Sequence, residues 1–228
     1  MAKGPKIKVT KDGPYLVTGG VPLGFESPVP NSSGDPVKWV KKETYSVKET
    51  YLLCRCGRSM NKPFCDSRHS ETNFSGRETA GQEEYLDNPR KYEGPDVDLL
   101  DIPDLCSGTR FCHPSGGVWG LTKKSDREKL KKIALQESCA CPSGRLTHVD
   151  KKNGKPVEPD FEPSISSTDD PGANTSGPLW VKGGVPVESS EGKTYRIRNR
   201  VTLCRCGKSL NKPFCDGAHM RFGASGSE

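Results

Sequence analysis

The sequence predicts a mainly β fold with short helices, of the α+β class, in which two small β-rich modules flank a different central segment. Three observations support this: a long internal repeat, alternating apolar and polar residues in each copy, and one helical pattern between the copies. Only 31% of the 228 residues are hydrophobic. We therefore expect something besides a large apolar core to help hold the chain together.

The internal repeat is the strongest of these signals. Residues 54–69, the first motif, are CRCGRSMNKPFCDSRH, and residues 204–219, the second motif, are CRCGKSLNKPFCDGAH, identical at 12 of 16 positions. Residues 13–22 match residues 177–186 at an offset of 164 instead of 150, so the first copy carries an insertion of 14 residues. The insertion falls in the Pro/Ser/Gly-rich run 24–36, for which we predict an exposed loop.

Each copy has two strand-like stretches, 15–17 with 45–53 and 179–181 with 195–203. In the last of these, apolar positions such as Val201 alternate with polar positions such as Arg200, the pattern of a half-buried strand. Ser125 followed by Glu128 forms a capping-box signature, which predicts a helix over 126–137. A short helix around 80–86 is also expected.

These elements divide the chain into five parts. They are a first module (1–70), an acidic linker (71–104), a central metal-binding segment (105–155), a second linker (156–176) and a second module (177–228).

The net charge of +6 is spread as +6, −7, +2 and +5 over residues 1–70, 71–104, 105–170 and 171–228. It forms no dense basic run, and no nucleic-acid-binding motif accompanies it, so we expect no nucleic-acid partner. No window approaches the roughly 20 apolar residues of a membrane span, and the first residues lack a signal-peptide pattern. We expect a cytoplasmic protein without a membrane partner, in which ten cysteines serve as metal ligands instead of disulfides.

Each motif supplies three thiolates and one imidazole, a complete set of four ligands. The sets are Cys54, Cys56, Cys65 and His69 in the first motif and Cys204, Cys206, Cys215 and His219 in the second. A single zinc ion would take all four ligands in one tetrahedron, whereas a 2Fe-2S cluster would take two on each iron. The spacing alone leaves both centres open.

The motifs resemble the CDGSH motif of the NEET family of iron-sulfur proteins. The second motif fits it at Cys204, Cys206, Ser209, Pro213, Cys215, Asp216, Gly217, Ala218 and His219. The first motif keeps all four ligands but departs from it at Ser67 and Arg68, where the family has glycine and a small residue.

This resemblance implies a 2Fe-2S cluster in each copy, with the two N-terminal cysteines on the buried iron and the last cysteine and the histidine on the outer iron. An imidazole in place of a thiolate raises the reduction potential, and acid is expected to loosen the cluster because the proton competes for the imidazole. Since NEET proteins typically form homodimers, the two copies here are expected to build an intramolecular pseudo-dimer about a pseudo-twofold axis, in a monomeric chain.

The central segment carries a looser pattern, Cys106, Cys112 and His113 followed by Cys139 and Cys141. It resembles the divergent 4Fe-4S mono-cluster domain, in which a Cys-Pro-Ser-Gly element closes a small ferredoxin-like site. Cys106, Cys112 and Cys141 are the first choice of ligands. Adding Cys139 would suit 4Fe-4S, and three thiolates alone would suit 3Fe-4S. Zinc is the rival, ligation by His113 is the less favoured alternative, and His148 is predicted to lie at the surface.

Three clusters in one chain favour electron transfer, with a redox partner protein. The alternatives are cluster storage or transfer, with an apo acceptor protein as partner, and a structural zinc protein. The chain has no phosphate loop, no dinucleotide fingerprint and no nucleophile free of metal duty, so a stand-alone enzyme is not expected.

Overall fold

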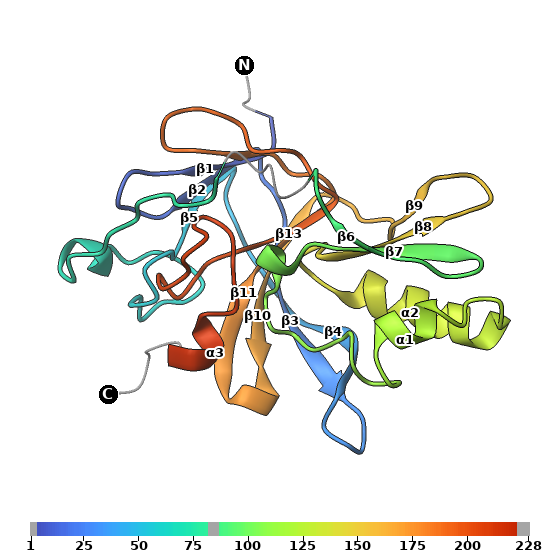
Figure 1. The fold of residues 1–228 in the computed structure, drawn as a ribbon. Helices are drawn as coiled ribbons and strands as arrows, with labels where there is room; N and C mark the ends of the chain where they lie inside the picture. Colours follow the sequence, from blue (N-terminus) through green and yellow to red (C-terminus); the bar gives the residue numbers. More distant parts are fainter. Residues whose placement is uncertain (1–3, 82–86, 223–228) are drawn as a thin grey trace.

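The computed structural model describes residues 4–81 and 87–222, and it confirms the mainly β fold class with short helices (Figure 1). Two sheets are built from the repeated copies, and a third is built from strands within residues 90–157. Their orders are β12-β1-β2-β5, β13-β11-β10-β3-β4 and β6-β7-β8-β9. The strands are β1 (Lys6–Val9), β2 (Tyr15–Thr18), β3 (Leu23–Pro30), β4 (Pro36–Tyr45), β5 (Thr50–Leu53), β6 (Arg90–Tyr92), β7 (Val97–Asp101), β8 (Leu146–Asp150), β9 (Pro156–Val157), β10 (Ser164–Asp170), β11 (Thr175–Lys182), β12 (Val187–Glu188) and β13 (Arg200–Leu203).

The helical elements are short and lie at the ends of the motifs, in or next to the central segment, and between β10 and β11. They are the α-helices α1 (Val118–Thr122), α2 (Glu128–Ala140) and α3 (His219–Phe222) and the 3₁₀ turns η1 (Arg68–Ser70), η3 (Pro103–Leu105) and η4 (Pro171–Ala173). No helix in the described ranges has the length and apolar character needed to cross a bilayer.

The two copies exchange strands. In the first copy β2 pairs antiparallel with β1 and β5, and in the second copy β11 pairs antiparallel with β10 and β13. β3 of the first copy then pairs in parallel with β10, and β12 of the second copy pairs in parallel with β1. Each copy thus supplies a strand to the other's sheet, which ties together segments far apart in the sequence.

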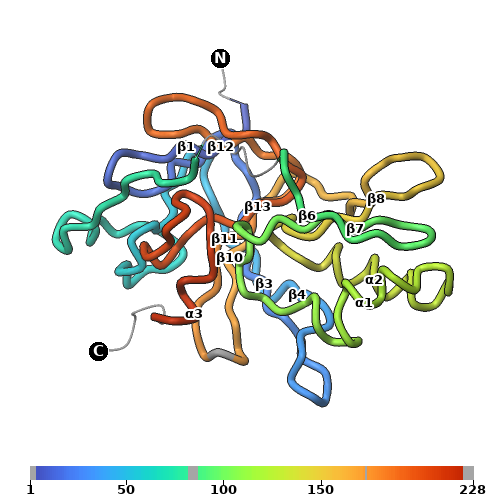
Figure 2. The backbone as a smooth tube through the Cα atoms, viewed as in Figure 1, coloured from blue at the N-terminus to red at the C-terminus, as the bar shows by residue number. Residues whose placement is uncertain are grey.

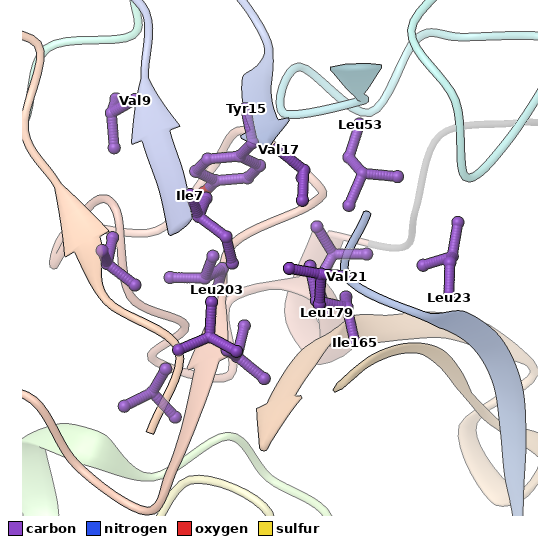
Figure 3. Close-up of a cluster of buried hydrophobic side chains, with 14 of the residues drawn as sticks. Ile7, Val9, Tyr15, Val17, Val21, Leu23, Leu53, Ile165, Leu179 and Leu203 are labelled. Atoms are coloured by element: carbon purple, nitrogen blue, oxygen red, sulfur yellow. The ribbon is translucent and has the colours of Figure 1, made fainter. Parts of the chain in front are cut away.

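The main core lies where these two sheets meet. Figure 3 shows apolar side chains from both copies pointing toward one another, among them Ile7, Val17, Leu179 and Leu203. All four are fully buried. Alternate residues of β1 and β5 are buried, as the period of two in a strand requires. The strands that lead into the two motifs are therefore anchored in one shared core.

The central sheet carries α1 and α2 on its own small core, which includes Leu99, Val118, Cys141 and Leu146. Figures 1 and 2 show the second motif (red) between the first motif (teal, left) and the central segment (green to yellow, right). The helix that we predicted over 126–137 is α2 and begins two residues later, after Arg127. The predicted cap is wrong, because the Ser125 hydroxyl accepts hydrogen bonds from the backbone of Asp96 and Val97 instead.

Three other elements differ from the sequence prediction. The insertion is not an exposed loop but the hairpin β3–β4, in which the Trp39 ring packs on Phe111 and Trp180. The strand predicted over 195–203 is limited to β13, and its polar face is covered, with Arg200 only 1% exposed. The segment 71–104 contains β6, β7 and η3, the segment 156–176 contains β9 and β10, and most of the helix expected around 80–86 lies outside the described residues.

His148 was predicted at the surface, and the structure contradicts this. Its ring is fully buried on β8, with Nδ1 2.8 Å from the Ser138 hydroxyl and Nε2 2.9 Å from the Thr122 hydroxyl. The two hydroxyl partners come from α1 and α2, so the sequence around His148 gives no sign of them. Burial among neutral groups lowers its pKa from 6.5 to about 4.

This lowered pKa predicts a loss of stability in acid. The unfolded chain binds a proton at His148 below pH 6.5 and the folded chain only near pH 4, so stability falls between these values as the pH drops. The full effect is about 3 kcal/mol. We expect a His148→Gln variant to lack this part of the dependence, as measured by urea unfolding of both proteins from pH 7 to 4. Parallel curves for the two proteins would contradict it.

Candidate metal centres

In the first motif the four predicted ligands form two close pairs. Cys54 and Cys56 follow β5 directly, and their sulfur atoms lie 3.7 Å apart. The Cys65 sulfur lies 3.5 Å from Nδ1 of His69, which η1 places one turn later. The first pair is buried and the second partly exposed.

The second motif repeats this arrangement. The Cys204 and Cys206 sulfur atoms are 3.7 Å apart, and Cys215 Sγ is 3.5 Å from His219 Nδ1. Backbone N–H groups also point at the sulfur atoms, such as those of Ser67 and Gly217, each 3.4 Å from the cysteine two residues before it. Such donors stabilise thiolates.

These distances match edges of coordination tetrahedra. Two thiolates about 2.3 Å from one metal lie about 3.8 Å apart, and a thiolate and an imidazole nitrogen about 3.5 Å apart. Each pair could therefore hold one metal ion. Within residues 4–81 and 87–222, however, no three Cys, His, Asp or Glu side chains lie close enough together to hold a single ion. The four ligands fit a two-metal centre with two ligands on each metal.

Within each N-terminal pair the two sulfur atoms share a proton. The hydrogen bond from Cys56 lowers the pKa of Cys54 to about 6 and raises that of Cys56, and in the second motif Cys206 is the thiol with the lowered pKa. One thiol of each pair thus ionises readily while the second resists, a property of the coupled pair. A bound metal removes this conflict because it holds both as thiolates.

A buried arginine stands between the two cysteines of each N-terminal pair in the sequence. Arg55 is 1% exposed and donates to the carbonyl oxygens of Gly13 and Gly76, and its Nη1 is buried without a hydrogen-bond partner. Arg205 donates to Gly177 and Thr168 and interacts electrostatically with Cys54 and Cys206. Buried cations require nearby negative charge. Anionic clusters at the two sites would supply it, so these residues fit the implied clusters.

The central segment brings three of its four cysteines around one small cavity. Cys106, Cys112 and Cys141 line it together with Arg145, which also pairs with Asp101. Burial, together with the neighbouring Cys141 and Cys106 thiolates, raises the pKa of Cys112 to about 12. Three thiolates in such a place repel one another, and a metal centre is the natural way to hold them ionised.

Cys139 and His113 lie apart from this cavity. The Cys139 thiol faces the Val157 carbonyl oxygen at 3.8 Å, on the far side of the α2 C-terminus from Cys141. His113 is exposed, with its ring against Trp119. The structure therefore groups the three first-choice thiolates and leaves the two alternative ligands outside.

Comparison with known proteins assigns each of these segments to a family. Residues 12–70 and 176–220 match the family described as iron-binding zinc finger CDGSH type, and residues 92–151 match the divergent 4Fe-4S mono-cluster family. The chain is a tandem CDGSH iron-sulfur protein with a central 4Fe-4S-type domain. No curated protein and no solved structure matches the chain. We call the three places the first CDGSH site, the second CDGSH site and the central centre.

The first CDGSH site departs from the family motif at a position that is free to vary. Ser67 is exposed, although its φ of 72° lies in the left-handed region that favours glycine. Gly217 has nearly the same φ, 79°, and a Cβ there would lie 3.3 Å from the Cys106 carbonyl oxygen. At the second site the central domain packs closely against Gly217, whereas Ser67 is exposed.

Tyr15 is a functional residue that the motifs do not reveal. Its hydroxyl, on β2 of the first copy, donates to the carbonyl oxygens of Cys204 at 2.8 Å and Pro213 at 3.0 Å in the second CDGSH site. The side chain is fully buried. Tyr15 therefore positions the loop that carries the second site, from the other copy.

We expect Tyr15→Phe to reduce the free energy of unfolding by about 1–3 kcal/mol, since it leaves a buried carbonyl without its donor. It should also alter the visible and paramagnetic resonance spectra of the second site alone. Tyr51→Phe is the matched control, because the buried Tyr51 hydroxyl donates to Val21 within the first copy. Unchanged second-site spectra in Tyr15→Phe would argue against this positioning role.

Arg68 predicts unequal reduction potentials. It places a positive charge beside the outer ligand pair of the first CDGSH site, where the second site has Ala218, although Asp66 at 3.4 Å offsets part of that charge. Positive charge favours the reduced cluster. We expect the first site to have the higher potential and Arg68→Ala to lower it, as seen in a redox titration followed by paramagnetic resonance. Two equal potentials in the unmodified protein would refute this.

Proposed function

We propose that this chain is an electron-transfer protein with two 2Fe-2S clusters and a third cluster. Cys54, Cys56, Cys65 and His69 hold one 2Fe-2S cluster, and Cys204, Cys206, Cys215 and His219 hold the other. The observation that carries the proposal is the division of each ligand set into two tetrahedral edges, 3.7 and 3.5 Å long, without a site for one ion in the described residues. A structural zinc site would gather all four ligands around one point.

For the central centre we propose ligation by Cys106, Cys112 and Cys141, which suits a 3Fe-4S cluster with one thiolate on each iron. The grouping of these three residues around one cavity, with Cys139 turned toward Val157, supports this choice over 4Fe-4S. We also propose that the two CDGSH modules are related by a pseudo-twofold axis, which the reciprocal pairing of β3 with β10 and of β12 with β1 supports.

Bound clusters supply one-electron chemistry, and the protein's own residues provide the surroundings that tune it. Arg205 places buried positive charge near Cys54 and Cys206, and backbone N–H groups donate to the sulfur atoms. Both features stabilise negative charge near the metals. They favour retention of the centres in both redox states.

The test is spectroscopy of the anaerobically purified protein, with iron, sulfide and zinc assayed on the same sample. Iron and sulfide sufficient for two 2Fe-2S clusters and one 3Fe-4S cluster are expected. A paramagnetic signal from the central centre should appear in the oxidised protein, with signals from both 2Fe-2S clusters after reduction by dithionite. A colourless protein containing zinc would refute the proposal.

Cluster transfer is the second candidate, and the partial exposure of Cys65 and His69 favours it. It predicts that the first site alone delivers its cluster to an apo-ferredoxin on mixing. Reversible reduction with full retention of iron would instead favour electron transfer.

A further inference from the structure

The second CDGSH site contacts both of the other centres. At the first site, a Cβ on Gly57 would lie 2.8 Å from the Cys206 carbonyl oxygen, and a Cβ on Gly207 would lie 2.9 Å from that of Cys56. The two inner ligand loops therefore pack directly on each other through glycines. No side chain can be inserted between them without moving backbone.

The other side of the second site contacts the central centre. Gly217, in the turn between Cys215 and His219, packs on the backbone of Cys106, Ser107 and Gly108. The Asn211 side chain donates to the Asp104 carbonyl oxygen, and Arg110 binds Asp170 at the end of β10 through two hydrogen bonds of 3.0 and 2.7 Å. These contacts hold residues 106–110 against the second site. The segment begins with Cys106, a proposed ligand of the central centre.

The three sites differ in their access to solvent. In the second site Cys215 and His219 are each 2% exposed. The equivalent Cys65 and His69 of the first site are partly exposed, and Asp66, Ser67 and Arg68 around them are exposed. At the central centre Cys106 and Cys112 are also partly exposed. The shielded site thus lies between two accessible ones.

We propose that the second CDGSH site is the internal connector of a three-centre electron relay, with the first CDGSH site and the central centre as its ends. This inference rests on the proposed electron-transfer function. Each step moves one electron, so that one cluster is oxidised as its neighbour is reduced, and no bond to a substrate forms or breaks. Partner proteins that carry one electron exchange it with this chain only at the first CDGSH site and at the central centre.

Electron injection at defined points tests the order of the centres. Met60 and Leu210 occupy equivalent positions in the two motifs and are 76% and 84% exposed. Each is replaced by cysteine in a Cys139→Ser background. The new cysteine is labelled with a ruthenium-bipyridine photosensitiser. The full-length, cluster-loaded protein is then reduced with dithionite. A flash with a cobalt(III) ammine quencher removes one electron from the label, which then takes one electron from the nearest cluster.

With the label at Met60→Cys we expect the first site to be oxidised first, then the second site and then the central centre. With the label at Leu210→Cys the second site should be oxidised first, before either end. His69→Cys and His219→Cys variants assign the two 2Fe-2S signals, because a fourth thiolate alters the spectrum. Oxidation of the central centre before the second site, from the label at position 60, would overturn the relay.

Gly217→Ser provides a structural test of the connection. The added side chain pushes against the Cys106 carbonyl, so the phase between the second site and the central centre should slow severalfold while the phase between the two CDGSH sites is retained. Ser67→Gly, the reciprocal exchange, should slow neither phase. An unchanged central phase in Gly217→Ser would contradict the proposed contact path. Absence of reducible clusters would instead refute the underlying function before any kinetics.

Discussion

Replacing Arg200 with methionine is expected to reduce the free energy of unfolding by about 3–5 kcal/mol and to release the central cluster. Arg200 is 1% exposed and extends from β13 of the second CDGSH module into the central domain. Its guanidinium donates to the carbonyl oxygens of Ser138, Cys139, Cys141 and Leu146 and to the Glu158 carboxylate. No other type of side chain could make this set of bonds from position 200, because only arginine has five N–H donors.

The reason for so large an effect is the position of these carbonyl groups. Three of them end α2, where the last carbonyl groups of a helix have no partner within it. Arg200 satisfies them and offsets the negative end of the helix dipole, and by doing so fixes Cys141. Methionine has a similar length but cannot donate, so all of these acceptors lose the guanidinium. The Glu158 carboxylate would keep only its bonds from Thr147 and Asn199.

Urea unfolding and the iron content of the purified variant measure the two parts of this prediction. Arg196→Met is the matched control, four residues earlier, because Arg196 pairs with Asp87 on the surface. Exposed ion pairs contribute little, so the control should keep both stability and iron. A stable Arg200→Met variant with a full central cluster would show that Arg200 does not hold the two domains together.

The close pairing of the four predicted ligands in each CDGSH site could be expected because these residues are local. All four ligands of each site fall within 16 residues, and the sequence repeats them. The fold class followed from the same repeat and from the alternation in strands such as β5. Local patterns of this kind carry over into the structure because the residues that form them are close together in the chain.

The errors all arise from contacts between segments distant in sequence. Pro28 and Pro30 made the insertion look like a loop, but they lie beyond Glu26, the last residue of β3 that pairs with β10. Their missing N–H groups therefore cost no bond to β10. Trp39 of the same hairpin donates to the Ala140 carbonyl oxygen, a tertiary contact across 101 residues.

Arg200 and His148 illustrate the same limit for polar residues. Alternation placed Arg200 on a polar face, and polar faces are usually exposed. The central domain covers that face, and its carbonyl groups make burial of the guanidinium favourable. The partners of His148, Ser138 and Thr122, come from separate helices, so no spacing in the sequence could reveal them.

The central centre offers the second large effect. Cys141→Ala is expected to abolish the central cluster, whereas Cys139→Ala, only two residues away, should retain it. The structure places the Cys141 thiol in the cavity with Cys106 and Cys112, 7% exposed and 3.5 Å from the Ser143 hydroxyl. The Cys139 thiol lies on the other side of the helix end, beside Val157.

The two alanine variants remove the same group from the same turn of chain, and the persistence of both 2Fe-2S signals shows that each variant is folded. Iron and sulfide should fall by the content of one cluster in Cys141→Ala, together with loss of the paramagnetic signal of the oxidised protein, while both 2Fe-2S signals persist. Cys139→Ala should keep all three. If Cys139→Ala instead loses the third cluster, all four thiolates are ligands and the centre is 4Fe-4S. The C-terminal end of α2 would then have a different conformation once the metal is bound.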